Sequence, residues 1–276
     1  MKSILIPTDF SESADFACNL GLEIAQKLQT RVTFLHLLST PVDWSKLPLE
    51  KENLYPETKA AIGDAKDKLL RLERKAYEKG VEAQTSLMFN IGIEEIHQYI
   101  STDKYFLVIM GTHGKKGKNR YTGTNTLKVI HKSPVPVLAV RAGTGVKLPQ
   151  KWLVVSDFLE DSNADFDLIM NLAKDLKANL HILYINTPYF FTETPEIKYK
   201  MEKFTSSHSE VQIEQSIVNA YNEERGIEAF VKEGDFDLVV LITHSRKGLN
   251  PVFRRGITEK VLNHLDTPVM SINSNA

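Results

Sequence analysis

The stretch Ile4-Leu5-Ile6-Pro7-Thr8-Asp9-Phe10 decides the fold, because it recurs as Trp152-Leu153-Val154-Val155-Ser156-Asp157-Phe158, 148 positions later. A second block pairs Leu107-Val108-Ile109 with Leu238-Val239-Val240 at an offset of 131, and Pro136-Val137 matches Pro268-Val269 at an offset of 132. Self-similarity over so long a period indicates a duplicated structural unit. The sequence therefore predicts two tandem copies, the second shorter between its two matching blocks.

The boundary between the copies falls in residues 142–150. This segment contains two glycines and a proline, which interrupt any regular pattern. We expect a first domain over residues 1–141 and a second over residues 151–276, joined by this linker. They are called the first copy and the second copy below.

Short aliphatic runs alternate with helical segments in the first copy. The runs cover residues 3–7, 31–37, 82–88, 105–110 and 136–140. Amphipathic segments over residues 13–28 and 60–79 separate some of them, and residues 41–58, with three prolines, suggest an irregular excursion. Such alternation is typical of right-handed βαβ crossovers. We therefore predict an α/β fold of two tandem doubly wound domains, each a five-stranded parallel sheet flanked by helices.

The composition excludes several classes of protein. The net charge of -1 and the pI near 6.7 supply no general attraction to nucleic acid or to an anionic membrane surface. The single cysteine, Cys18, excludes an intramolecular disulfide. No apolar run reaches the ~18 residues that a membrane helix needs. We expect a cytoplasmic protein that binds neither nucleic acid nor membrane.

Ligands of open parallel sheets bind beyond the carboxyl ends of the strands, where the strand order reverses. In the first copy these ends are Pro7-Thr8-Asp9, His36-Leu37 and Met110-Gly111-Thr112-His113-Gly114. Gly123-Thr124-Asn125-Thr126 then opens a helix. Glycines allow backbone to approach a phosphate, and the free amides at a helix start attract it. If the first, second and fourth strands are neighbours, these ends converge on one crevice.

These motifs, in this order, resemble the universal stress protein family, and the resemblance covers both copies. It implies a five-stranded parallel sheet and, in some members, bound ATP. Carried onto this chain, it implies that Asp9 contacts ribose or adenine, that Leu37 packs on the base, and that four residues meet the phosphates: Gly111, Gly114, Gly123 and Thr124. The full expected site is Pro7, Thr8, Asp9, Leu37, Met110, Gly111, His113, Gly114, Gly123, Thr124 and Asn125, and the ligand is ATP or another adenine nucleotide, with or without magnesium.

Both copies depart from the family pattern. The family separates its second and third glycines by nine residues, whereas only eight lie between Gly114 and Gly123. In the second copy, Ile242, Ser245 and Arg255 stand where the three glycines would be. We therefore expect the first copy to bind nucleotide and the second to be degenerate.

Several alternatives remain open from the sequence. Asp9 can equally well cap or orient the first helix with Ser11 or Ser13, and the copies of His113 and Asp9 in the second copy, His244 and Asp157, favour structural roles. No catalytic constellation is evident, so a regulatory binding protein is favoured over a slow ATP hydrolase or a module that binds no nucleotide. The resemblance also implies that the last strands of the two copies pair within the chain, and it leaves a homo-oligomer and an unknown client protein open.

Overall fold

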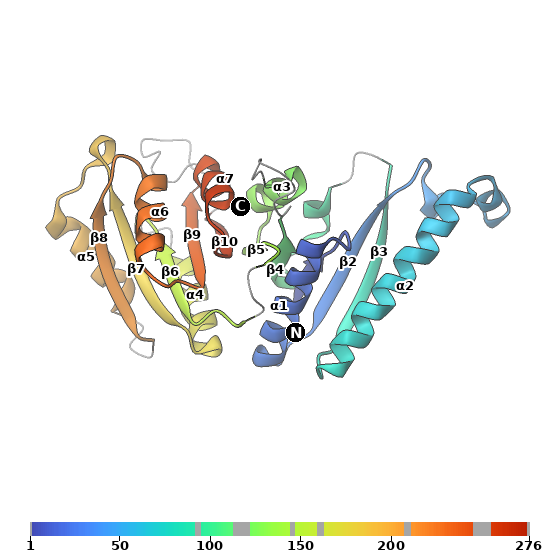
Figure 1. Ribbon diagram of the computed structural model, residues 1–276, viewed down its shortest axis with the longest axis horizontal. Coiled ribbons are helices and arrows are strands. Elements are labelled where there is room, and N and C mark those ends of the chain that lie inside the picture. The colour runs from blue at the N-terminus through green and yellow to red at the C-terminus, as the bar shows by residue number, and fades with distance from the viewer. Residues whose placement is uncertain are drawn as a thin grey trace.

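A computed structural model describes residues 2–91, 95–112, 122–143, 147–158, 163–206, 211–244 and 255–274. Ten strands form one sheet in the order β3-β2-β1-β4-β5-β10-β9-β6-β7-β8 (Figure 1). The strands of the first copy are β1 (Ser3–Pro7), β2 (Val32–Ser39), β3 (Ala83–Asn90), β4 (Tyr105–Gly111) and β5 (Val137–Val140). Those of the second copy are β6 (Lys151–Val155), β7 (Asn179–Asn186), β8 (Ile213–Asn219), β9 (Leu238–His244) and β10 (Val269–Ser274). Strand order in each half is the one expected of a doubly wound sheet.

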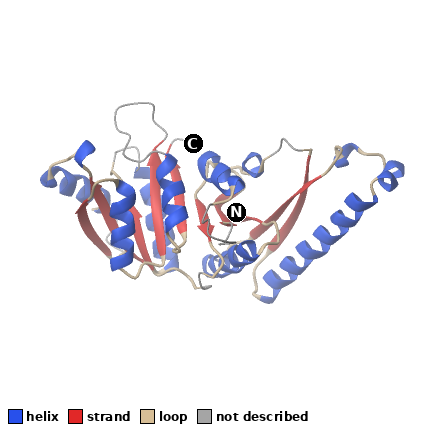
Figure 2. Ribbon diagram, turned by 45° about the horizontal axis from the view of Figure 1, so that its top comes forward, coloured by secondary structure: helices blue, strands red, loops and turns tan. Residues whose placement is uncertain are grey.

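Helices cover both faces of this sheet, as Figure 2 shows. One face carries α1 (Glu12–Leu28), α2 (Pro56–Glu78), α4 (Asn163–Leu176) and α5 (Thr194–Thr205), whose apolar residues share one core cluster. The other face carries α3 (Thr124–Lys132), α6 (Glu223–Glu233), α7 (Arg255–His264) and the short 3-10 helix η3 (Ile96–Tyr99). In β1, Ile4 and Ile6 join the first cluster and Leu5 the second. All five β1 residues are buried, because a strand covered on both faces has no solvent side.

The predicted elements of the first copy agree with the structure, with two differences. The excursion after β2 contains the 3-10 helices η1 (Trp44–Lys46) and η2 (Leu49–Leu54). Helix α2 then begins at Pro56, four residues earlier than predicted. A proline is favourable there because backbone N–H groups in the first turn of a helix have no hydrogen-bond partner within the helix, so the N–H that proline lacks is not needed.

The two copies join through their last strands. Strands β5 and β10 pair antiparallel, with Val269 opposite Ala139 and Ser271 opposite Val137. All other strand pairs among the described residues are parallel. The pairing removes two apolar edges that would otherwise be exposed, and it confirms the expectation that the copies pair within the chain. The remaining edges are β3 and β8, whose second and third residues are polar and exposed.

The duplication extends to unusual backbone positions. Among the described residues, four other than glycine have positive φ: Phe10 (61°), Gln29 (49°), Phe158 (52°) and Lys177 (58°). They form two pairs, and the members of each pair lie 148 positions apart (158 − 10 and 177 − 29). Because side chains disfavour this region, its recurrence at matching positions shows that the two copies share local geometry as well as topology.

Candidate functional site

The turn that follows β1 forms one wall of the predicted crevice. The backbone N–H of Phe10 donates to Thr8 Oγ1 at 3.0 Å, and that of Ser11 donates to Asp9 Oδ1 at 3.0 Å. Ser11 caps α1 by accepting from the Ala14 N–H at 3.3 Å. Thr8 is buried and Asp9 is exposed. Asp9 therefore orients the turn into α1 while it remains accessible at the rim of the crevice.

The end of β2 forms the neighbouring wall. His36 Nδ1 lies 2.7 Å from the Thr8 carbonyl oxygen, so Nδ1–H donates to it. The imidazole also packs against the Phe10 ring, with centroids 4.5 Å apart. These two contacts fix the imidazole of His36 against the turn that follows β1. Leu37, the next residue, is half-buried and thus has a partly accessible apolar surface.

Gly111 at the end of β4 meets the first turn of α1. A Cβ at Gly111 would lie 2.4 Å from the Ser13 carbonyl carbon and 2.6 Å from the Ala14 nitrogen. Backbone atoms within a helix cannot yield to such a clash. Helix packing therefore requires glycine at this position, whether or not a phosphate binds nearby.

The N-terminus of α3 lies next to Gly111. Thr126, in the first turn of α3, donates through its hydroxyl to the Gly111 carbonyl at 3.2 Å. Gly123 is the N-cap of α3, and no side chain caps the helix within the described part of the chain. Its first turn has no acidic residue. Among the described side chains, the first turn of α3 therefore has neither a capping hydrogen bond nor a carboxylate.

The structure brings together most of the predicted residues that it describes. The end of β1 (Pro7, Thr8, Asp9) lies between the ends of β2 (Leu37) and β4 (Met110, Gly111). The first turn of α3 holds Thr124 and Asn125. Asn125 is exposed, whereas Met110 is buried. His113 and Gly114 lie outside the described residues. The predicted neighbourhood of the first, second and fourth strands is confirmed.

The sequence named Ser13, Thr126 and Cys18 without indicating their contacts at this site. Ser13 and Thr126 contact Gly111, as described above. Burial raises the pKa of the Cys18 thiol to about 12, with the Asp15 charge adding to the shift and the Lys75 charge and a hydrogen bond with Thr8 opposing it. A buried thiol of this kind is a packing residue. Only the three-dimensional proximity of α1 to β1 and β4 shows these roles.

The matching strand ends of the second copy are built differently. Ile242 replaces the glycine of β4 and is fully buried. Ser156 reproduces the Thr8 turn, since its hydroxyl accepts from the Phe158 N–H at 3.0 Å. Ser245 and the side chain of Arg255 lie outside the described residues. A separate cavity of about 390 Å³ lies between α5 and β8, and none of the predicted site residues line it.

Comparison with known proteins gives consistent results. Universal stress protein MJ0577 of Methanocaldococcus jannaschii is 29% identical over 153 residues, which span 51% of this chain and 94% of that protein. A crystal structure of a universal stress protein from Archaeoglobus fulgidus is 18% identical, with a TM-score of 0.76, and the match covers 99% of this chain and 98% of that one. At that identity the likeness shows the fold, and it extends through both copies.

A universal stress protein solved in complex with cAMP is 17% identical, with a TM-score of 0.37, and the match covers 46% of this chain and 97% of that one.

No helix among the described residues is long and apolar enough to cross a membrane. The universal stress protein family itself matches this chain twice, over residues 1–141 and 149–273. Because these two tandem matches account for nearly the whole sequence, the chain belongs to the universal stress protein family.

Proposed function

We propose that this chain is a cytoplasmic regulatory protein that binds ATP or another adenine nucleotide in its first copy and acts through binding rather than turnover. The proposal assigns residues 1–141 to the nucleotide domain, residues 142–150 to the linker and residues 151–276 to a degenerate partner domain. The observation that carries it is the start of α3 beside the end of β4, which Gly123 leads and which no described side chain caps.

The start of α3 favours a phosphate at this place. The amides of its first turn and the positive end of its dipole attract an anion. Helix α1 also begins near the crevice, but the Ser11 hydroxyl and two acidic residues, Glu12 and Asp15, already satisfy its first turn. Phosphate is therefore directed to α3 and away from α1.

The position in the sheet supports the same ligand. The chain leaves β1 toward β2 on one side and returns to β4 on the other, so the crevice between the ends of β1 and β4 is the point where strand order reverses. Leu37 offers half-buried apolar surface for a base, and Asp9 offers an exposed carboxylate for ribose hydroxyls. In the second copy, the buried Ile242 fills the position of Gly111, which disfavours a second nucleotide.

The test is calorimetry on the full chain after removal of any co-purified nucleotide. ATP, ADP, AMP and cAMP are titrated with and without magnesium, and each mixture is assayed for product to detect turnover. We expect one nucleotide per chain. The absence of heat for every nucleotide at millimolar concentration would refute the proposal.

Gly123→Asp separates binding from folding. Aspartate is a good N-cap residue, so the variant should unfold at the same temperature as the original protein or slightly above it. Its carboxylate would occupy the amides of α3 and repel phosphate, so we expect at least a tenfold loss of affinity. Gly63→Ala is the matched control, because Gly63 lies in α2 with no atom within 4 Å of an added Cβ. Equal affinity in Gly123→Asp and in the control would contradict phosphate binding at α3.

A further inference from the structure

Helices α6 and α7 of the second copy bring two carboxylates and an imidazole together. His264 Nδ1, at the end of α7, lies 2.9 Å from Glu224 Oε1 and 2.5 Å from Glu228 Oε1. Glu224 and Glu228 are four residues apart and therefore share one face of α6. One ligand atom from each of the three residues lies within 4.8 Å of the others. Both carboxylates are largely buried, whereas the imidazole is half-exposed.

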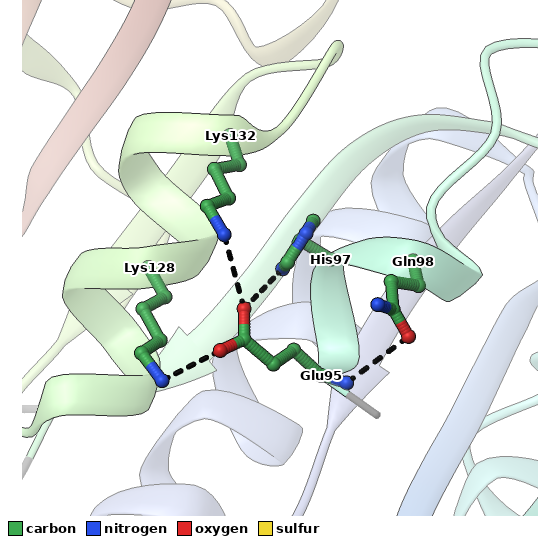
Figure 3. A network of polar contacts seen from close by, with 5 residues as sticks. All are labelled: Glu95, His97, Gln98, Lys128 and Lys132. Carbon is green, nitrogen blue, oxygen red and sulfur yellow. Dashed lines mark hydrogen bonds and ion pairs between the residues drawn. The ribbon is translucent and has the colours of Figure 1, made fainter. Parts of the chain in front are cut away.

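The first copy has an ion-pair cluster at the corresponding place, which Figure 3 shows. Glu95, at the start of η3, accepts from Lys128 at 2.6 Å and from Lys132 at 3.2 Å, both on α3, and its Oε2 lies 3.1 Å from Nδ1 of His97. Lys128 and Lys132 match Lys260 and His264 at the offset of 132. Lys260 likewise contacts Glu224, at 3.2 Å. In both copies, therefore, ion pairs join the last helix to the helix that precedes it, α3 to η3 in the first copy and α7 to α6 in the second.

Two differences between the second-copy cluster and the first-copy cluster favour a bound cation in the second. A permanently charged lysine, Lys132, is replaced by an imidazole at His264, and a second carboxylate, Glu228, is added. With neutral imidazole, the second cluster has two negative charges and one positive charge, whereas the first has one negative and two positive. The second cluster therefore attracts a cation where the first repels one.

We propose that Glu224, Glu228 and His264 form a site for a divalent transition-metal ion such as Zn²⁺, which links α6 to α7. Two carboxylate oxygens and one imidazole nitrogen, completed by water, are a common ligand set for zinc. Ligand atoms that lie ~2.0–2.2 Å from a tetrahedral metal are separated by roughly 3.3 Å. The three atoms need only small rotations of their side-chain tips to reach that spacing. His264 would bind the metal through Nδ1 as neutral imidazole, with its single ring proton on Nε2.

Lys260 is compatible with this site. Its ammonium group contacts Oε2 of Glu224, whereas Oε1 is the oxygen that faces His264. One carboxylate can therefore bind the lysine and the metal through different oxygens. Lys260 holds the Glu224 side chain in place and leaves a cluster charge of −1 for the incoming ion.

The test is titration of the tag-free, nucleotide-free full chain with Co²⁺, whose visible absorption reports the ligand geometry, followed by competition with Zn²⁺. We expect one Co²⁺ per chain with absorption typical of low coordination number, displacement by Zn²⁺, and a higher unfolding temperature with Zn²⁺ than with chelator. The absence of saturable Co²⁺ binding would overturn the proposal.

His264→Lys recreates the first-copy arrangement and should fold for that reason. Glu228→Gln changes a single atom of the carboxylate. Each variant should weaken metal binding at least about tenfold, since even outer groups around metal sites contribute about 10–100-fold. Glu95→Gln, in the first-copy cluster, is the matched control and should bind metal normally. Undiminished affinity in either ligand variant, with the fold verified by circular dichroism, would overturn the three-ligand assignment.

Discussion

The side-chain oxygen of Asn263, in the second copy, accepts two hydrogen bonds from Thr122 of the first copy, one from the backbone N–H at 2.7 Å and one from the hydroxyl at 2.9 Å. Thr122 immediately precedes Gly123, the N-cap of α3. At the other end of α3, Asn273 Nδ2 donates to the Ile130 carbonyl at 2.6 Å. The second copy thus holds both ends of the helix that carries the proposed phosphate site (Figure 1).

Asn263→Ala should loosen the start of α3. The substitution removes a partly buried acceptor, so the backbone N–H and the hydroxyl of Thr122 both lose their partner. We expect the free energy of unfolding, measured in urea, to fall by about 1–3 kcal/mol. Hydrogen exchange at the Thr122 amide should accelerate, and nucleotide affinity should fall. Asn263→Asp retains the accepting oxygen and should preserve amide protection. Unchanged exchange in Asn263→Ala would show that this contact does not hold the helix start.

Gly111→Ala should destabilise the protein even without ligand. The added Cβ would clash with the backbone of Ser13 and Ala14, at 2.4–2.6 Å. Since α1 and β4 must separate to admit it, we expect a loss of at least about 2 kcal/mol. Gly63→Ala, in the middle of α2, should instead stabilise by about 0.5–1 kcal/mol. Urea unfolding of both variants measures the contrast, and a similar effect of the two substitutions would contradict the close approach of α1 to β4.

Thr8→Val should weaken the turn that follows β1. The substitution preserves the buried shape and removes the oxygen that accepts from the Phe10 N–H at 3.0 Å. We expect a loss of about 1–2 kcal/mol, because that N–H loses its partner at a strained positive φ. Thr8→Ser should be nearly neutral, because Ser156 performs the same role in the second copy. Thermal unfolding compares the two, and equal stability of Thr8→Val and Thr8→Ser would show that the hydroxyl is dispensable.

Glu95 should make stability depend on pH in the acid range. Hydrogen bonds from Lys128 and Lys132 lower the pKa of its carboxyl. Its folded pKa is therefore below the unfolded value, so its contribution is present above about pH 4 and is lost as the pH falls through the folded pKa. The difference in unfolding temperature between the original protein and Glu95→Gln should shrink as the pH decreases from 6 to 3. Glu82→Gln, which removes an exposed pair with Arg31 at 3.9 Å, should show a smaller difference throughout.

Much of the fold could be predicted because it depends on local patterns. The near-continuous apolar run of β1 and its recurrence in β6 predict buried parallel strands in two copies, since only strands covered on both faces lack polar alternation. The spacing of the strand ends also predicts which loops converge. The start of α2 was less predictable, because Pro56 fits both a loop and the first turn of a helix.

The site could be predicted in part. The sequence predicted that the segments around Gly111 and Gly123 converge, and the structure places them next to each other through Thr126. A phosphate bound there stays a prediction. The sequence could not indicate that Gly111 is also required by α1, because that constraint arises from the approach of two elements separated by almost a hundred residues. The same is true of Glu224, Glu228 and His264, whose side chains meet only when α6 packs beside α7.

The sequence by itself determined the duplication, the alternation of strands and helices and the loss of glycine at Ile242, since these are properties of residue order and of local conformational preference. The tertiary structure decided how the copies depend on each other. Pairing of β5 with β10 aligns the copies, and that alignment brings Asn263 to Thr122 and Asn273 to Ile130. Contacts between residues more than 140 positions apart depend on the relative placement of whole sheets, which no local pattern encodes.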